Sequence, residues 1–133
     1  MKMKKRILLA DDETIVLKVT KLRLEHEGFE VMTAIDGEDT LDKVRAGGGF
    51  DLILLDIKMP RLDGFEVVKK LKENSSTAKI PVILFTASSE RWQSLIAKCA
   101  ELGIADYLQK PFQSNELIDK VRRALGKEAK PNA

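Results

Sequence analysis

Side chains that could carry out chemistry stand directly after the apolar runs of this chain, where strands are expected to end. They are Asp11, Asp12, Asp56, Thr86 and Lys110. Carboxylates packed within a few ångströms repel one another, and one of them takes up a proton unless a cation intervenes. A hard divalent ion resolves this conflict, and Mg²⁺ suits a site built from a few carboxylates, waters and phosphate oxygens. The set predicts a magnesium site that also binds a phosphoryl group.

Asp56 is the residue that we assign as the nucleophile of this site. It closes the apolar run 52–55, and a buried carboxylate is costly unless it is paired or bound to a cation. A carboxylate attacks phosphorus when the phosphoryl group is positioned and its charge is neutralised. Mg²⁺, the Lys110 ammonium and the Thr86 hydroxyl would together cover the phosphoryl oxygens. The chain therefore predicts an acyl phosphate on Asp56.

Five short apolar runs alternate with five helical patterns along the chain. The runs occupy residues 7–10, 31–34, 52–55, 82–85 and 105–109. Most of them do not alternate with polar residues, as expected of strands that are covered on both faces. This order predicts a parallel sheet with helices on both faces, joined by right-handed crossovers. Ligands of such sheets bind at the carboxyl ends of the strands, where the candidate side chains stand.

Apolar residues at helical spacing mark the expected helices. In the first helix they are Ile15, Val16, Val19 and Leu22, with Gly28 as a stop signal. In the last helix they are Leu117, Ile118, Val121, Ala124 and Leu125, with Ser114 as the expected N-cap. Glu13, next to the acidic pair, is interpreted as a cap of the first helix, where a negative charge is favourable, rather than as a metal ligand.

Composition narrows the class of protein without naming a partner. The 133 residues suffice for one globular domain, with 44% hydrophobic and 33% charged residues and a formal net charge of +2. We see no concentrated basic stripe for direct binding of nucleic acid, no run of membrane-spanning length and no secretory signal. The single Cys99 cannot form an internal disulfide, which fits a reducing cytoplasm.

Taken in order, these motifs resemble the receiver domain of two-component response regulators across nearly the whole chain. The matching motifs are Asp11-Asp12, Asp56 with Met59-Pro60 and Asp63-Gly64, Thr86-Ala87, Tyr107, and Lys110-Pro111-Phe112. The resemblance implies a flavodoxin-like, doubly wound (βα)5 three-layer sandwich, an α/β fold whose five-stranded parallel sheet has the order 2-1-3-4-5. We expect the domain to occupy residues 1–126, and residues 127–133 to form a polar tail or the start of a linker.

The resemblance also implies a role for each site residue. Asp56 would be the phosphoacceptor and Lys110 would pair with the phosphoryl group. Mg²⁺ would be held by Asp11, Asp12, Asp56 and the backbone carbonyl of Lys58. Thr86 and Tyr107 would form the switch, in which the aromatic ring moves inward when the threonine moves. Lys58 and Ser88 occupy positions that would tune dephosphorylation.

The implied function is a phosphorylation-controlled signalling switch in the cytoplasm. The phosphoryl group would come from a histidine kinase or a phosphotransfer protein, and its loss would be a magnesium-dependent self-dephosphorylation. The protein would not be an enzyme beyond its own phosphoryl uptake and loss. A downstream protein would bind the face formed by the fourth helix, fifth strand and fifth helix. We expect a monomer or a weak phosphorylation-dependent dimer, without membrane contact.

Two other functions compete with this one. The first is a magnesium-dependent phosphohydrolase with an aspartyl-phosphate intermediate, but such haloacid-dehalogenase-like enzymes carry a D-x-D pattern, whereas Asp11 and Asp12 are adjacent. The second is a receiver-like binding module that works without phosphorylation, although such proteins usually lack part of the acidic or lysine set that this chain has complete.

Overall fold

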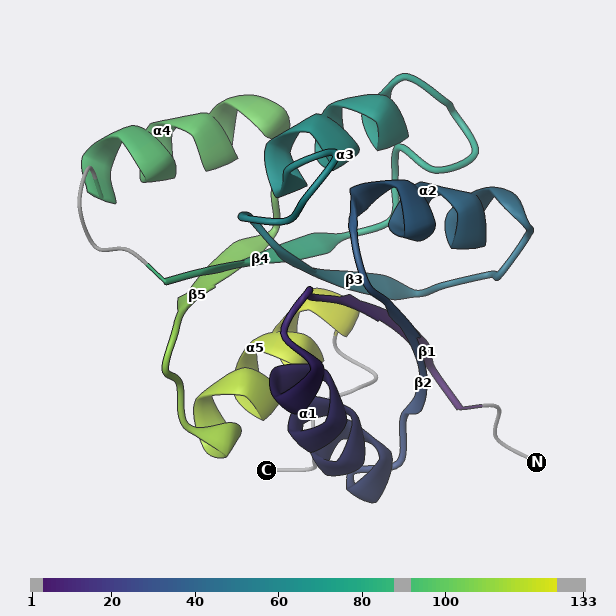
Figure 1. The fold of residues 1–133 in the computed structure, drawn as a ribbon, viewed down its shortest axis with the longest axis vertical. Helices are drawn as coiled ribbons and strands as arrows, with labels where there is room; N and C mark the ends of the chain where they lie inside the picture. The colour runs from purple at the N-terminus through teal and green to yellow at the C-terminus, as the bar shows by residue number, and fades with distance from the viewer. Residues whose placement is uncertain (1–3, 88–91, 127–133) are drawn as a thin grey trace.

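The computed structural model describes residues 4–87 and 92–126, in which strands and helices alternate strictly (Figure 1). The strands are β1 (Arg6–Ala10), β2 (Glu30–Ala34), β3 (Leu52–Asp56), β4 (Val82–Thr86) and β5 (Asp106–Gln109). The helices are α1 (Thr14–His26), α2 (Gly37–Arg45), α3 (Gly64–Lys72), α4 (Trp92–Leu102) and α5 (Ser114–Leu125). The five expected strands are confirmed, and each differs from its expected range by one residue at one end only.

The strands form one parallel sheet in the order β2-β1-β3-β4-β5, which confirms the expected topology. Helices α1 and α5 cover one face of the sheet, and α2, α3 and α4 cover the other (Figure 1). From β1 the chain proceeds to β2 on one side and later to β3 on the other. The carboxyl ends of β1 and β3 therefore flank the point at which the strand order reverses, the usual ligand position in such sheets.

The core is divided by the sheet into two apolar clusters. On the side of α1 and α5 the cluster includes Ile7, Leu9 and Phe85, and on the other side it includes Leu8 and Leu84. Side chains alternate between the two faces because successive residues of a strand point in opposite directions. Every residue of β3 and β4 is buried, which explains why these runs read as continuously apolar in the sequence.

Helix α5 packs as its apolar pattern predicts, but α1 does not. The side chains of α5 that face the sheet are Leu117, Ile118, Val121 and Leu125, all buried. In α1 the buried residues are Leu17, Thr20 and Leu24, whereas Ile15, Val19 and Leu22 are 76%, 61% and 67% exposed. The expected apolar face of α1 is thus turned to solvent, because α1 carries apolar residues on both sides and its spacing alone does not choose between them.

Two expectations at the helix ends have different outcomes. The expected N-cap of α5 was wrong by one residue, since Gln113 is the N-cap and Ser114 is the first helical residue. Gly28 has a φ of 97°, so the stop signal after α1 is confirmed by a left-handed backbone that glycine adopts without strain. None of the helices in residues 4–87 and 92–126 is long and apolar enough to cross a membrane.

Candidate functional site

Three carboxylates meet at the carboxyl edge of the sheet, as the sequence predicted. Asp11 follows β1, Asp56 ends β3, and Asp12 lies beside them, with one carboxylate oxygen of each within 4.8 Å of the others. Asp11 and Asp56 are buried at 0% and 6% exposure, whereas Asp12 is exposed. The loop that leaves β1 lets the two adjacent aspartates turn toward the same edge.

The Lys110 ammonium, at the end of β5, lies among these acids. Its Nζ is 2.6 Å from Oδ2 of Asp11 and 3.4 Å from Oδ2 of Asp56. A third carboxylate, that of Glu13, accepts a hydrogen bond from the same Nζ at 2.9 Å. Burial alone would lower the pKa of Lys110, but the hydrogen bonds that its ammonium donates to Asp11 and Glu13, together with the charge of Asp56, raise this pKa above its usual range. Lys110 is therefore a permanent cation in this site.

Asp56 is not fully compensated by that single cation. Burial is the largest cause that raises its pKa, from 3.8 to about 6, and the charge of Asp11 adds to it, while Lys110 lowers it. A carboxylate that is destabilised by burial and by a neighbouring anion gains from a second cation. The donor set of three carboxylates matches what Mg²⁺ prefers, so the residues present fit this metal.

Three of these acids, Asp12, Glu13 and Asp56, line an open pocket of about 300 Å³ together with Lys110, and we call it the acidic pocket. Its lining residues are Asp12, Glu13, Asp56, Ile57, Lys58, Thr86, Ala87 and Lys110. Thr86, the last residue of β4, is buried at the base of the edge, and Lys58 is exposed at the rim. Ser88, the second predicted tuning residue, lies outside the described residues.

The loop that carries Lys58 is held close to the phosphoacceptor candidate. Ile57 donates its N–H to Phe85 O at 3.0 Å and accepts from Gly64 N–H at 2.8 Å. A Cβ on Gly64 would lie 2.7 Å from the backbone oxygen of Asp56, so only glycine fits there. Asp63 and Glu66 form a capping box that starts α3, which confirms the turn and helix start expected at Asp63-Gly64.

The same loop also rests on the N-terminus of α2. A Cβ on Gly37 would lie 2.3 Å from Leu62 O. Arg61, between Pro60 and Leu62, has a φ of 75°, a strained value for a residue with a side chain. Its guanidinium forms ion pairs with Asp36 at 3.4 Å and Glu38 at 3.2 Å. The loop conformation is thus imposed by contacts with α2 rather than by local preference.

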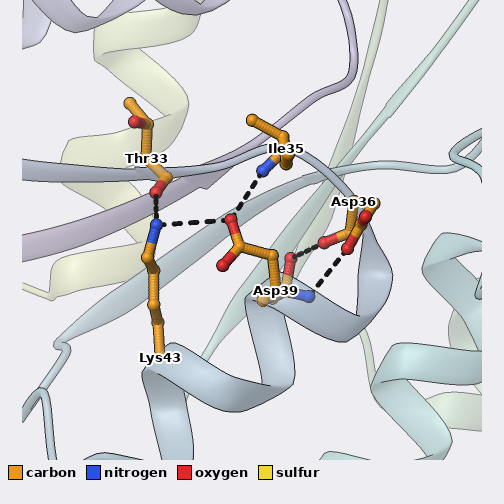
Figure 2. Close-up of polar contacts among 6 residues, drawn as sticks. Thr33, Ile35, Asp36, Asp39 and Lys43 are labelled. Atoms are coloured by element: carbon orange, nitrogen blue, oxygen red, sulfur yellow. Dashed lines mark hydrogen bonds and ion pairs between the residues drawn. The ribbon is translucent and has the colours of Figure 1, made fainter.

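The N-terminus of α2 is in turn fixed to the end of β2 (Figure 2). Asp36 caps the helix by accepting from Asp39 N–H at 2.7 Å, which confirms the turn expected at Asp36-Gly37. The Asp39 carboxylate accepts from Ile35 N–H at 3.0 Å and from Lys43 Nζ at 3.3 Å. Lys43 Nζ also donates to Thr33 O at 2.6 Å. This chain of contacts connects the loop that carries Lys58, through the N-terminus of α2, to the end of β2.

Tyr107 lies on the same face of the sheet as Thr86. In the register of β4 and β5, Tyr107 pairs with Leu84 and Gln109 pairs with Thr86. Leu84 and Thr86 are two residues apart and point to the same face. The half-buried Tyr107 ring packs against the core cluster that contains Leu84, so the two predicted switch residues occupy neighbouring strands on one side.

Two features of the site were missed by the sequence analysis. Glu13 is at the N-cap position of α1, but its side chain makes no capping hydrogen bond and is paired with Lys110 instead. Beside the acidic pocket lies a groove of about 590 Å³, which we call the apolar groove. It is lined by Glu13, Ile15, Val16, Val19, Thr20, Ala87, Lys110, Pro111 and Phe112. Glu13 and Lys110 are 97 residues apart in the sequence, so no local pattern could have revealed their contact.

The fold and this edge define a doubly wound α/β protein with a carboxylate-rich site at the carboxyl ends of its strands. A model of the response regulator receiver domain matches residues 7–122. The alkaline phosphatase synthesis transcriptional regulatory protein PhoP of Bacillus subtilis is 37% identical over 92% of this chain and 49% of its own length. Response regulator ArlR of Staphylococcus aureus is 34% identical over 92% of this chain and 53% of its own length.

Solved structures agree with these matches. A CheY-like response regulator receiver domain protein from Methanospirillum hungatei superimposes with a TM-score of 0.82 at 32% identity, covering 92% of this chain and 94% of that one. Chemotaxis response regulator CheY4 of Vibrio cholerae gives a TM-score of 0.84 at 28% identity, covering 92% and 99%. The chain belongs to the response regulator receiver domain family, the receiver part of two-component signalling. It spans about half the length of the curated relatives it matches.

Proposed function

We propose that Asp56 accepts a phosphoryl group from a phosphohistidine of a histidine kinase or phosphotransfer protein, in a magnesium-dependent reaction. The observation that carries this proposal is the meeting of three carboxylates within 4.8 Å, with the Lys110 ammonium 3.4 Å from Asp56. In the step, an oxygen of Asp56 forms a bond to phosphorus while the phosphorus–nitrogen bond breaks. The imidazole nitrogen keeps the electron pair and takes up a proton.

The residues of the acidic pocket divide the work of this step. Asp11, Asp12, Asp56 and the backbone carbonyl of Lys58 are the proposed Mg²⁺ ligands, and the ion supplies positive charge for the phosphoryl oxygens. Lys110 supplies a second positive charge, and the buried Thr86 hydroxyl donates a hydrogen bond. Self-dephosphorylation needs a water in line with Asp56, and the exposed Lys58 at the rim would influence the entry of that water.

Phosphorylation would be transmitted through Thr86 and Tyr107 to the surface of α4, β5 and α5. A phosphoryl group on Asp56 draws the Thr86 hydroxyl toward it, and the half-buried Tyr107 ring on the adjacent strand occupies the space that opens. A downstream protein would bind this surface with altered affinity. The cytoplasmic location and the monomer or weak dimer stay predictions.

The apolar groove is the proposed docking place of the phosphodonor. Any protein donor must bring its phosphohistidine to the acidic pocket, and the groove shares Glu13, Ala87 and Lys110 with that pocket. Ile15 and Val19, which line the groove, are exposed on α1, and the exposed Leu22 of the same helix extends this apolar surface. Such a surface, next to a site that needs a macromolecular donor, suits a helix of that donor.

The test is phosphorylation of the chain by acetyl phosphate with Mg²⁺, followed as an acid-labile phosphate by intact mass. We expect one phosphoryl group on the wild-type chain, and none on Asp56→Asn or when EDTA is present. Full labelling of Asp56→Asn would contradict the assignment. If the chain hydrolysed acetyl phosphate steadily, at a rate far above that of its slow self-dephosphorylation, the result would favour a phosphohydrolase instead.

Docking is tested separately, with a double variant, Ile15→Ser with Val19→Ser. We expect labelling by acetyl phosphate to be retained and labelling by a phosphorylated histidine phosphotransfer domain to fall by about tenfold or more, because each lost apolar contact weakens the complex. An equal loss with both donors would contradict docking on α1.

A further inference from the structure

We propose that Glu13 is a positioning residue that restrains the Lys110 ammonium in the unphosphorylated protein and competes with the phosphoryl group for it. The inference rests on the proposed function, because it concerns how Lys110 becomes free to bind a phosphoryl group on Asp56. Glu13 is neither a metal ligand nor a helix cap in this view, and it acts through Lys110.

The distances around Lys110 show which acids hold it. Its Nζ lies 2.6 Å from Asp11 and 2.9 Å from Glu13, but 3.4 Å from Asp56. An ammonium has three N–H donors, and the two shortest contacts use two of them. The weakest of the three contacts is therefore the one with the proposed phosphoacceptor.

Asp11 and Glu13 differ in what else they do. Asp11 is buried, accepts a hydrogen bond from Glu13 N–H at 2.9 Å, and belongs to the carboxylate cluster that fits Mg²⁺. The Glu13 side chain is 61% exposed, so water readily solvates its carboxylate when the ion pair opens. Glu13 is thus the partner that Lys110 can release at little cost when a phosphoryl oxygen replaces it.

The ion pair stands where a donor would arrive. Glu13 and Lys110 line both the acidic pocket and the apolar groove, so they form the boundary between them. A phosphoryl group that enters the pocket carries more negative charge than one carboxylate and attracts Lys110 more strongly. The lysine then exchanges the Glu13 oxygen for a phosphoryl oxygen, and no covalent bond of either residue changes.

The experiment measures binding of beryllofluoride in the presence of Mg²⁺ to the full chain, by NMR titration. We expect Glu13→Gln to bind about two- to fivefold more tightly than the wild type, the range that an ion pair with one exposed partner is worth. Glu13→Asp, which keeps the charge but is shorter by one methylene group, should also bind more tightly. The matched control is Glu73→Gln, an exposed glutamate at the C-cap of α3, which should bind as the wild type does.

Other outcomes of this titration would contradict the proposal or the function on which it rests. Equal or weaker binding by Glu13→Gln overturns the restraint. Tighter binding by Glu13→Gln with wild-type binding by Glu13→Asp also overturns it, because the effect then comes from the charge at a distance and not from the contact. Failure of the wild-type chain to bind beryllofluoride would instead refute the proposed function. A merely structural role of Glu13 would change thermal stability without changing this affinity.

Discussion

The face of the sheet beneath α5 and the carboxyl edge beside α1 use apolar and charged residues in opposite ways. Beneath α5, Leu117 and Val121 are 1% and 0% exposed. At the carboxyl edge, Asp11 and Asp56 are buried, while Ile15 and Val19 on α1 are exposed. Beneath α5, apolar side chains are buried, as is usual in a globular protein. At the carboxyl edge, carboxylates are buried and aliphatic side chains are exposed.

This difference indicates that the carboxyl edge is less stable than it could be because it serves a function. A buried carboxylate with a raised pKa and exposed aliphatic side chains are both unfavourable in a protein that only needs to fold. Here the buried carboxylate and the exposed aliphatic side chains lie next to one another, on either side of Glu13 and Lys110. This combination distinguishes the carboxyl edge from the face beneath α5. If the comparison is right, truncating a buried side chain beneath α5 should lower the free energy of unfolding, and removing the buried charge of Asp56 should raise it. Truncating an exposed side chain of α1 should leave it nearly unchanged.

The largest effect is expected beneath α5. Leu117→Ala should lower the free energy of unfolding by roughly 2–5 kcal/mol, because the removed atoms lose their burial and leave a cavity. Urea unfolding followed by circular dichroism measures it. Leu22→Ala, a leucine of α1 that is 67% exposed, is the matched control and should change the value by less than about 0.5 kcal/mol. Equal losses in both variants would break the comparison.

Removing the buried charge at the edge should stabilise the protein without Mg²⁺. The folded state holds the Asp56 proton more tightly than the unfolded state does, so stability from this group falls as the pH rises from about 4 to about 6. Moving a pKa from 3.8 to about 6 corresponds to on the order of 3 kcal/mol at neutral pH.

Asp56→Asn, which cannot ionise, should therefore exceed the wild type in free energy of unfolding, and by about 1 kcal/mol more at pH 7 than at pH 5. Urea unfolding at the two pH values in EDTA measures this difference. Saturating Mg²⁺ should reduce the advantage of the variant, because the cation compensates the wild-type carboxylate. A variant less stable than the wild type at pH 7 would show that Asp56 is already compensated.

A smaller effect is expected where the site loop rests on α2. Gly37→Ala places a Cβ against Leu62 O, and the loop must shift, at a cost of about 1–3 kcal/mol. Because this loop carries the proposed carbonyl ligand of Lys58, binding of beryllofluoride with Mg²⁺ should weaken as well. Glu38→Ala, which removes only an exposed ion pair with Arg61, should leave that binding unchanged. Unchanged binding in Gly37→Ala would separate the loop from the metal site.

The smallest effect on stability is expected on the exposed face of α1. Val19→Ala should change the free energy of unfolding by less than about 0.5 kcal/mol, since the side chain is mostly in water. Its effect should appear only in phosphotransfer from a protein donor, which sharpens the contrast with Leu117→Ala. A loss of stability near that of Leu117→Ala would mean that the α1 face is covered in solution.

Some positions of the site could be predicted from the sequence, and others could not. The strand-end positions of Asp11, Asp56, Thr86 and Lys110 were predictable, because parallel strands bring their carboxyl ends to one edge. The pairing of Glu13 with Lys110 was not, because Glu13 also stands where a helix cap would stand and its partner is distant in sequence. The close contact of Leu62 with Gly37 was equally unpredictable, since it depends on the loop after β3 meeting the N-terminus of α2 in space.

The sequence by itself determined the order of strands and helices, the residues available at the strand ends and the magnesium-compatible set of acids. These follow from local periodicity and from the topology that alternating elements impose. The tertiary structure alone decided which side of α1 is buried, because that helix is apolar on both sides and only packing against the sheet selects Leu17 and Leu24. It also decided that Glu13 holds Lys110, since a contact between distant residues depends on how the whole chain closes.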